Sequence, residues 1–220
     1  MGRWIALDTP HGTVRAWRAE PATAPRGAVV VVQEIFGVNA HIRDVAQRFA
    51  AAGWRALAPA VLDPVEADVE LDYDESGVQH GRALVAELGF DRAVDIVGAA
   101  ATVLRNEGAA VGAVGFCWGG TVAFLANTRL GLPAVSYYGG RSVPFLDEAT
   151  RAPMLFHFGE RDPIIPPEHV ELHRAKQPQA TIHVYPAGHG FNCDRRGDYH
   201  ADSATLAWER TLAFLDAHVR

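Results

Sequence analysis

Three side chains of the kinds used in acyl transfer occur in a fixed order along the chain: Cys117, Asp162 and His189. A thiol is only slightly ionised at neutral pH, so a cysteine nucleophile needs a base or an ion-pair partner, which His189 would supply. Asp162 would fix the tautomer of the imidazole and stabilise the imidazolium. These residue types therefore predict a nucleophile, a base and the group that orients the base.

Cys117 lies in the glycine-rich hexapeptide GFCWGG, between the apolar run Ala110–Val114 and the helical pattern Thr121–Asn127. This arrangement of strand, tight turn and helix is typical of a nucleophile elbow, with cysteine in place of the more usual serine. A side chain at residue 115 or 119 would collide with the neighbouring strand or helix. The helix N-terminus would favour the thiolate. The alternative is that Cys117 is a small buried apolar residue.

Short strand-like and helix-like segments alternate through the whole sequence, which predicts an α/β fold with a mainly parallel, doubly wound sheet and helices on both faces. Cys117, Asp162 and His189 each follow a predicted strand, where open α/β sheets place their ligand sites. Their order is that of the α/β-hydrolase fold. We expect one domain over residues 1–220. Strands are predicted at 3–7, 13–18, 28–32, 54–58, 110–114, 134–138, 153–158 and 181–185. Helices are predicted after an N-cap at Asn39 and at 80–88, 91–107, 121–127, 168–177 and 199–218.

Composition excludes several classes of protein. The net charge of −6 argues against a nucleic-acid partner, because no basic stripe offsets it. Two cysteines imply no disulfide framework and fit a reducing, cytoplasmic location. The sequence has no signal-peptide h-region, no run long enough to span a membrane, and no metal or nucleotide motif. We expect a monomer or small homo-oligomer that needs no cofactor and no metal, with a small molecule as its partner.

The segment from Pro64 to Glu75 alternates acidic and apolar residues. This pattern is typical of a solvated excursion. A lid near the active site is the alternative.

The loop Gln33–Gly37 follows a predicted central strand, where α/β-hydrolases place one of two oxyanion donors. The two donors would be the backbone N–H groups of Trp118 and Ile35. Glu34 in the same loop would disfavour the thiolate by like-charge repulsion, yet it could hold the thiol proton by a hydrogen bond. A solvated loop carboxylate is the alternative.

These segments together resemble the dienelactone hydrolase (carboxymethylenebutenolidase) family, from about Val29 to the C-terminal helix. The motifs that carry the resemblance are QEIFG at 33–37, GFCWGG at 115–120, YYG at 137–139, the turn at 159–162 and GHGF at 188–191.

The resemblance implies hydrolysis of a lactone ring by an acyl-thioester route. Cys117 would be the nucleophile, His189 the base and Asp162 its orienter. Glu34 would hold the resting thiol and take its proton when substrate arrives.

The resemblance also implies arginines that bind a substrate carboxylate, and here the sequence departs from the family. The family's arginine four residues after the histidine is Cys193 in this chain, so Arg195 or Arg196 would have to substitute. Arg82 is the best match for the family's other arginine. Phe36 and Tyr137 are further candidates for the substrate pocket.

The substrate is therefore expected to be a dienelactone-like lactone or a small ester. A general carboxylesterase or thioesterase of the same family is one alternative. A catalytically silent small-molecule binding protein on the same scaffold is another.

Overall fold

The computed structural model describes residues 2–219, which form two compact units. The first unit holds residues 2–112 together with residue 219, and the second holds residues 113–218. Both units combine strands with helices, as the alternating sequence pattern predicts. No helix among the described residues has both the length and the hydropathy that a membrane span requires. The expectation of one domain over residues 1–220 stays a prediction.

The first unit contains β1 (Arg3–Thr9), β2 (Gly12–Ala19), β3 (Ala28–Val32) and β4 (Arg55–Pro59) in the order β1-β2-β4-β3. β1 and β2 form an antiparallel hairpin, β2 pairs antiparallel with β4, and β3 runs parallel to β4. All five residues of β3 are buried, as expected for a β-branched run that is covered on both faces.

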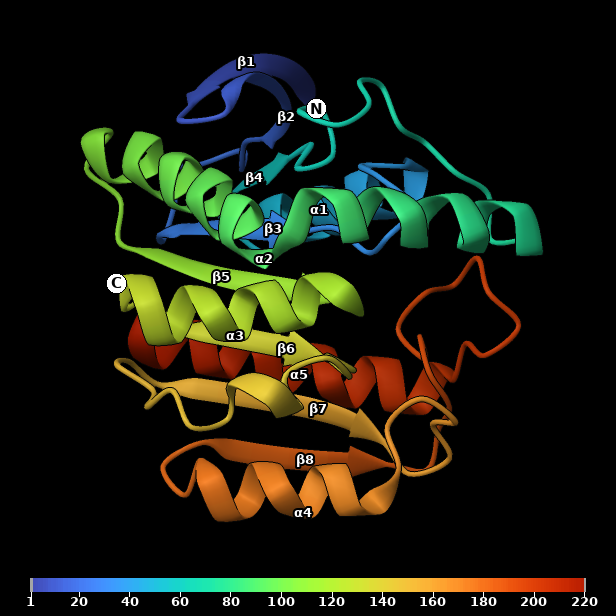
Figure 1. The fold of residues 1–220 in the computed structure, drawn as a ribbon. Coiled ribbons are helices and arrows are strands. Elements are labelled where there is room, and N and C mark those ends of the chain that lie inside the picture. Colours follow the sequence, from blue (N-terminus) through green and yellow to red (C-terminus); the bar gives the residue numbers. More distant parts are fainter. Residues whose placement is uncertain (1, 220) are drawn as a thin grey trace. The chain divides into compact units, whose positions relative to one another are not determined.

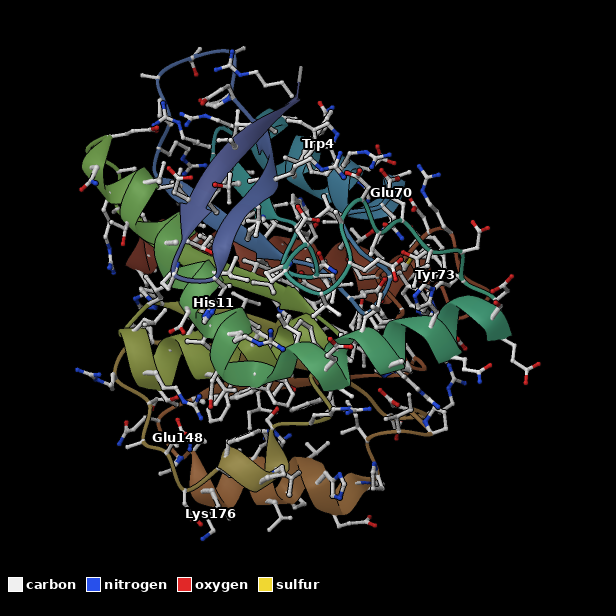
Figure 2. The ribbon with its side chains drawn as sticks, turned by 45° about the horizontal axis from the view of Figure 1, so that its top comes forward. Trp4, His11, Glu70, Tyr73, Glu148 and Lys176 are labelled. Carbon is white, nitrogen blue, oxygen red and sulfur yellow. The ribbon has the colours of Figure 1, made fainter. Side chains whose placement is uncertain are left out.

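Helices α1 (Ala40–Ala51) and α2 (Glu75–Asn106) pack against these strands, and α2 lies nearer the viewer in Figure 1. Asn39 caps α1, because its side-chain oxygen accepts a hydrogen bond from a backbone N–H of the first turn at 3.2 Å. This confirms the predicted N-cap. In the turn of the β1–β2 hairpin, labelled in Figure 2, His11 lies 2.9 Å from the carboxylate of Asp95 in α2.

The start of α2 differs from the sequence prediction. The pattern places the first helical residue at His80, but the helix begins earlier, at Glu75. Asp74 is the cause, since its carboxylate accepts the backbone N–H of Gly77 at 2.7 Å and caps the helix. Gly89, with φ 74° and ψ 164°, interrupts the helix and confirms the predicted break.

The second unit contains four parallel strands in the order β5-β6-β7-β8. Because parallel strands point the same way, the loops that follow them lie at one edge of this sheet. The strands are β5 (Val111–Phe116), whose residues from 113 onward belong to this unit, β6 (Ala134–Tyr137), β7 (Met154–Gly159) and β8 (Thr181–Tyr185). The helices are α3 (Trp118–Leu130), the short 3₁₀ helix η1 (Val143–Phe145), α4 (Pro167–Lys176) and α5 (Ala201–His218).

Successive side chains of β6 identify which helix covers which face of this sheet. Ser136 lies on the α3 side, where its Oγ would be 2.8 Å from a Cβ added at Gly120. The next side chain, Tyr137, points to the other face, and its hydroxyl lies 2.6 Å from that of Thr211 in α5. Helices α3 and α5 therefore cover opposite faces, and Figure 1 shows α3 in front of the strands and α5 behind them.

His157 in β7 is a packed core residue. Its Nδ1 lies 2.8 Å from the hydroxyl of Tyr185, and its Nε2 lies 3.1 Å from that of Thr211. Burial, together with the nearby His183 and Arg210, lowers the pKa of His157 well below its usual value. The neutral ring serves as a hydrogen-bonded contact between β7 and α5.

Candidate active site

Cys117 occupies a strained turn between the end of β5 and the start of α3. Its backbone has φ 53° and ψ −119°, which residues with a side chain rarely adopt. A Cβ on Gly115 would lie 1.9 Å from the carbonyl oxygen of Gly119. A Cβ on Gly120 would lie 2.8 Å from the carbonyl oxygen of Tyr137. This confirms the predicted strand, glycine turn and helix, and the collision predicted for residue 115. The second crowded position is Gly120, whereas the collision predicted for residue 119 stays a prediction.

The close approach at Gly115 gives a stability prediction. Gly115→Ala is expected to lower the free energy of unfolding by about 1–3 kcal/mol, because backbone rather than a flexible side chain blocks the new methyl group. Urea denaturation followed by circular dichroism measures the change. Gly197→Ala is the matched control, since a Cβ there meets nothing within 4 Å. Equal stabilities of the two variants would contradict the packing described for the turn.

The structure brings Cys117, His189 and Asp162 together within the second unit. The Nε2 of His189 lies 3.2 Å from the Sγ of Cys117, and its Nδ1 lies 2.7 Å from Oδ2 of Asp162. Both the histidine and the aspartate are only 5% exposed. A carboxylate at Nδ1 fixes the tautomer that carries its proton there, which leaves Nε2 to exchange a proton with the sulfur.

Asp162 is itself held in place by the turn that follows β7. Its Oδ1 accepts the backbone N–H groups of Ile164 at 2.8 Å and Ile165 at 3.2 Å. The other carboxylate oxygen is thus directed at His189. One carboxylate therefore both stabilises the turn and accepts the hydrogen bond of the imidazole.

The protonation of His189 depends on its two partners. Burial by itself lowers the pKa of this imidazole, but the negative charges and hydrogen bonds of Cys117 and Asp162 outweigh burial and raise it to about 10. A protonated His189 beside a thiolate is an ion pair, in which the sulfur is ready to attack and the ring is ready to donate a proton.

The protonation of His189 has a pH dependence that can be measured. Because the pKa lies above the usual 6.5, the protonated ring favours the folded state below that pH, and the contribution is lost as the pH rises through about 10. Nitrogen-15 NMR at about pH 8 is expected to show His189 as an imidazolium. In Cys117→Ala the pKa of His189 should fall, because a main cause of the raised value is removed. A wild-type titration near 6.5 would contradict the ion pair.

Glu34 is completely buried at the end of β3, so it is not a solvated loop carboxylate. The hydroxyl of Tyr73 donates a hydrogen bond to its Oε2 at 3.0 Å. Tyr73 also packs edge-on against Phe36, with ring centroids 4.6 Å apart. Ile35 and Phe36 are both buried in the same loop.

Tyr73 reaches Glu34 because the acidic segment lies against the loop Gln33–Gly37. Glu70 forms a β-bridge with Gly37, and the backbone N–H of Leu71 donates to the carbonyl of Phe36 at 3.0 Å. Figure 2 labels Glu70 and Tyr73 on this segment. Tyr73 could not be identified from the sequence, where its only signal is a single aromatic residue between two aspartates.

The other predicted site residues of the second unit occupy different environments. Trp118, the first residue of α3, is 3% exposed. Tyr137 is fully buried, with its ring stacked 4.8 Å from that of Phe116. The aromatic ring that meets His189 belongs instead to the next residue, Tyr138, at a centroid distance of 5.2 Å.

The three arginines considered for a substrate carboxylate are also placed differently. Arg82 on α2 and Arg195 are exposed. The guanidinium of Arg196 lies over Gly190, where a Cβ would be 3.1 Å from it, and its side chain is only 19% exposed. Since Gly190 follows His189 directly, Arg196 is the arginine that the fold of this loop brings beside the histidine.

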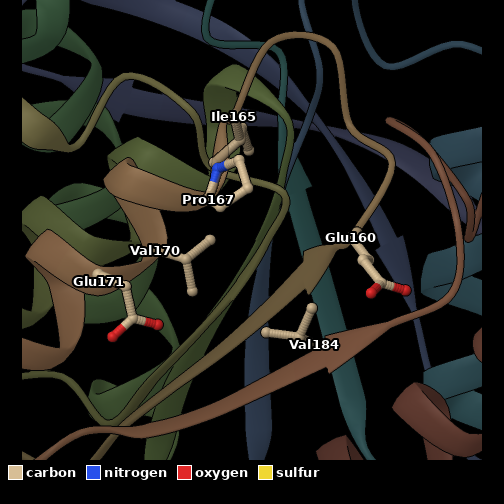
Figure 3. A pocket seen from close by; sticks show the side chains of 7 residues that line it. Glu160, Ile165, Pro167, Val170, Glu171 and Val184 are labelled. Atoms are coloured by element: carbon tan, nitrogen blue, oxygen red, sulfur yellow. The ribbon is translucent and has the colours of Figure 1, made fainter.

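A small pocket of about 120 Å³ lies near the turn that carries Asp162. Figure 3 shows its largely apolar wall, with the carboxylates of two glutamates at its edges. Its lining contains neither Cys117 nor His189, so it is separate from the sulfur and the imidazole. The lining residues are Gly159, Glu160, Ile165, Pro167, Val170, Glu171 and Val184.

The chain is similar to known proteins over nearly its whole length. A carboxymethylenebutenolidase of Pseudomonas putida is 32% identical to the chain, covering 96% of it and 94% of the relative. A Synechocystis protein whose name assigns the same activity provisionally is 34% identical, covering 98% of the chain and 96% of the relative. The crystal structure of a Klebsiella pneumoniae protein, provisionally named a dienelactone hydrolase, superposes with a TM-score of 0.87 at 30% identity. That comparison covers 97% of both chains.

The sequence profile of the dienelactone hydrolase family matches residues 14–219, nearly the whole chain. The profile match, the relatives and the superposition confirm both the expected α/β-hydrolase fold and the resemblance noted in the sequence. The chain belongs to the dienelactone hydrolase family.

Proposed function

We propose that the protein opens a dienelactone-like lactone, or cleaves a small ester, through an acyl-thioester on Cys117. Membership of the dienelactone hydrolase family makes it a hydrolase of lactones or esters. The observation that supports the cysteine route is the hydrogen-bonded chain from Sγ of Cys117 through the imidazole of His189 to the carboxylate of Asp162.

In the first half of the proposed reaction, the Cys117 thiolate attacks the substrate carbonyl carbon and forms a tetrahedral oxyanion. The carbon–oxygen bond to the leaving group then breaks, and the imidazolium of His189 gives its proton to the departing oxygen. The products of this half are an acyl-thioester and a neutral imidazole. In a lactone the leaving oxygen stays attached to the acyl group, so no fragment departs.

In the second half, the neutral His189 takes a proton from a water molecule, whose oxygen attacks the thioester carbonyl. Collapse of this intermediate breaks the carbon–sulfur bond and releases the carboxylic acid product. The imidazolium and the thiolate are regenerated together, which restores the ion pair. The raised pKa of His189 keeps the ring protonated at neutral pH before the first step. Acylation removes the charge of Cys117, one of the causes of the raised pKa, so the ring is free to lose its proton as the thioester forms.

The backbone N–H groups of Trp118 and Ile35 are proposed as the oxyanion donors. Trp118 is the first residue of α3, so its N–H belongs to the helix N-terminus, where the helix dipole favours negative charge. A positioned donor of this kind contributes about 3 kcal/mol to stabilising the transition state. Glu34 is proposed to hold the proton of the Cys117 thiol before substrate is bound, as the family resemblance implies, and to take it when substrate arrives. That transfer would produce the thiolate of the ion pair used in the first half of the reaction.

A cysteine nucleophile also bears on the substrate. Its thiolate is a good leaving group, so an ester or lactone with a stabilised leaving oxygen suits it better than an amide. In a dienelactone the leaving group is an enolate, which meets that requirement. Arg196 is proposed, ahead of the exposed Arg82 and Arg195, as the group that meets a substrate carboxylate, because its guanidinium lies beside the loop of His189.

Steady-state hydrolysis of a dienelactone beside a neutral activated ester tests this proposal. We expect the dienelactone to be turned over with the higher kcat/KM. Turnover of only the neutral ester would keep the cysteine chemistry and remove the lactone assignment, in favour of a general carboxylesterase or thioesterase. No turnover of either would favour the silent binding protein.

A further inference from the structure

Tyr138, the residue after β6, has an unusual backbone. Its φ is +41°, in the left-handed region that bulky residues rarely occupy, and its side chain is fully buried. Only two other described non-glycine residues have positive φ, and one of them is Cys117. Strained backbone of this kind persists where the surroundings impose it, and it concentrates at functional sites.

The strand geometry explains what the strain achieves. Ser136 and Tyr137 point to opposite faces of the sheet, so a continued strand would send Tyr138 to the α3 face. That face is closed at this level, since a Cβ on Gly139 would lie 2.8 Å from the carbonyl carbon of Gly120. The positive φ of Tyr138 turns its ring away from the α3 face, to which the alternation of a regular strand would send it.

The backbone around Tyr138 joins the two strands that carry the nucleophile and the acid. The carbonyl of Tyr137 accepts the N–H of Cys117 at 3.0 Å. The N–H of Tyr138 donates to the carbonyl of His157 in β7 at 2.8 Å, and β7 leads into the turn of Asp162. The peptide group between Tyr137 and Tyr138 therefore forms hydrogen bonds to Cys117, at the end of β5, and to β7, which precedes Asp162.

The ring of Tyr138 completes the arrangement by contacting the histidine. It packs edge-on against His189, with centroids 5.2 Å apart and planes at 61°. It also packs edge-on against Phe191, at 5.3 Å and 73°. Such edge-to-face contacts restrict how an aromatic ring can rotate. The imidazole must keep one orientation to face Asp162 and Cys117 at the same time.

We propose that Tyr138 is a positioning residue for His189, and that its strained backbone holds the ring where it fixes the plane of the imidazole. The inference rests on the proposed function, because it gives His189 the task of the base. Tyr138 acts through His189 and needs no contact with the substrate. The effect should therefore appear in kcat rather than in KM.

Two substitutions distinguish the effect of the Tyr138 ring on activity from the effects of its hydroxyl group and of its side-chain volume. Tyr138→Phe keeps the ring, so kcat is expected to stay within about threefold of wild type. Tyr138→Leu keeps an apolar side chain and removes the ring, so kcat is expected to fall about 10- to 100-fold with little change in KM. Phe156→Leu is the matched control, because it removes a fully buried ring that packs on Phe124 and His173.

The NMR spectrum of His189 gives a readout that needs no substrate. The ring protons of His189 are expected to shift in Tyr138→Leu, and its pKa to fall as its contacts with Asp162 and Cys117 loosen. Phe156→Leu should leave the ring-proton shifts and the pKa of His189 unchanged, although its melting temperature should fall about as much as that of Tyr138→Leu. Unchanged His189 signals and kcat in Tyr138→Leu would overturn the proposal, as would equal losses in Tyr138→Phe and Tyr138→Leu.

The two proposals fail in different ways. Full activity of Cys117→Ala would overturn the cysteine mechanism, whereas the NMR comparison would still report whether Tyr138 orients the imidazole.

Discussion

Cys117→Ala is expected to lower kcat/KM for a dienelactone or an activated ester by about 10⁴- to 10⁶-fold, since loss of a nucleophile removes the covalent route. Alanine keeps the Cβ that the strained turn already accommodates at φ 53°, so the fold should survive. The activity that remains would come from binding and the oxyanion donors. Steady-state assays with purified variant, at concentrations high enough to measure the residual rate, give the ratio.

Cys193→Ala is the matched control for this experiment, because the chain has only two cysteines. Cys193 is fully buried, so its replacement tests the effect of losing a buried thiol. We expect Cys193→Ala to retain most of the wild-type kcat/KM. Full activity in Cys117→Ala, or an equal loss in both variants, would contradict the assignment of Cys117 as the nucleophile.

Asp162→Asn is expected to lower kcat by about 10³- to 10⁴-fold, by analogy with the loss of the acid in a serine triad. The amide can still accept the backbone N–H groups of Ile164 and Ile165, so the turn should keep its shape. It cannot neutralise an imidazolium, however, and an amide N–H facing Nδ1 would select the wrong tautomer of His189. The pKa of His189 should fall as well, since Asp162 is one of the causes that raise it.

Asp147→Asn is the control for this variant, since Asp147 pairs only with Lys176 among the hydrogen bonds described and is strongly exposed. We expect Asp147→Asn to change kcat by less than about twofold, as is usual for surface positions. A loss of less than about tenfold in Asp162→Asn would show that His189 does not depend on the carboxylate.

Much of the fold could be predicted because local signals agree with the final structure. The β-branched run Ala28–Val32 is a strand with the predicted bounds, and so is Thr181–Tyr185. The start of α2 was predicted too late, because the apolar pattern is weak before His80 and the cap is a single aspartate. Asp74 lies in an acidic segment, so its sequence does not distinguish a capping aspartate from the neighbouring acidic residues.

The candidate site was predictable where it depends on residue type and position after a strand. Cys117, Asp162 and His189 meet these conditions, and the structure brings them together. Tyr138 was missed because its ring reaches His189 through a positive φ, which the sequence of a strand end does not indicate. Arg196 was only one of three candidate arginines, because its position depends on how the loop after His189 folds back.

The covalent intermediate gives the most direct test of the central claim, that Cys117 carries the acyl group. An activated ester with a slowly released acyl group is mixed with the wild-type protein, quenched during the burst and analysed by peptide mass spectrometry. We expect one acyl group per protein, on the peptide that contains Cys117, and no burst in Cys117→Ala. A burst with Cys117 unmodified, or with the acyl group on Cys193 or another residue, would contradict it.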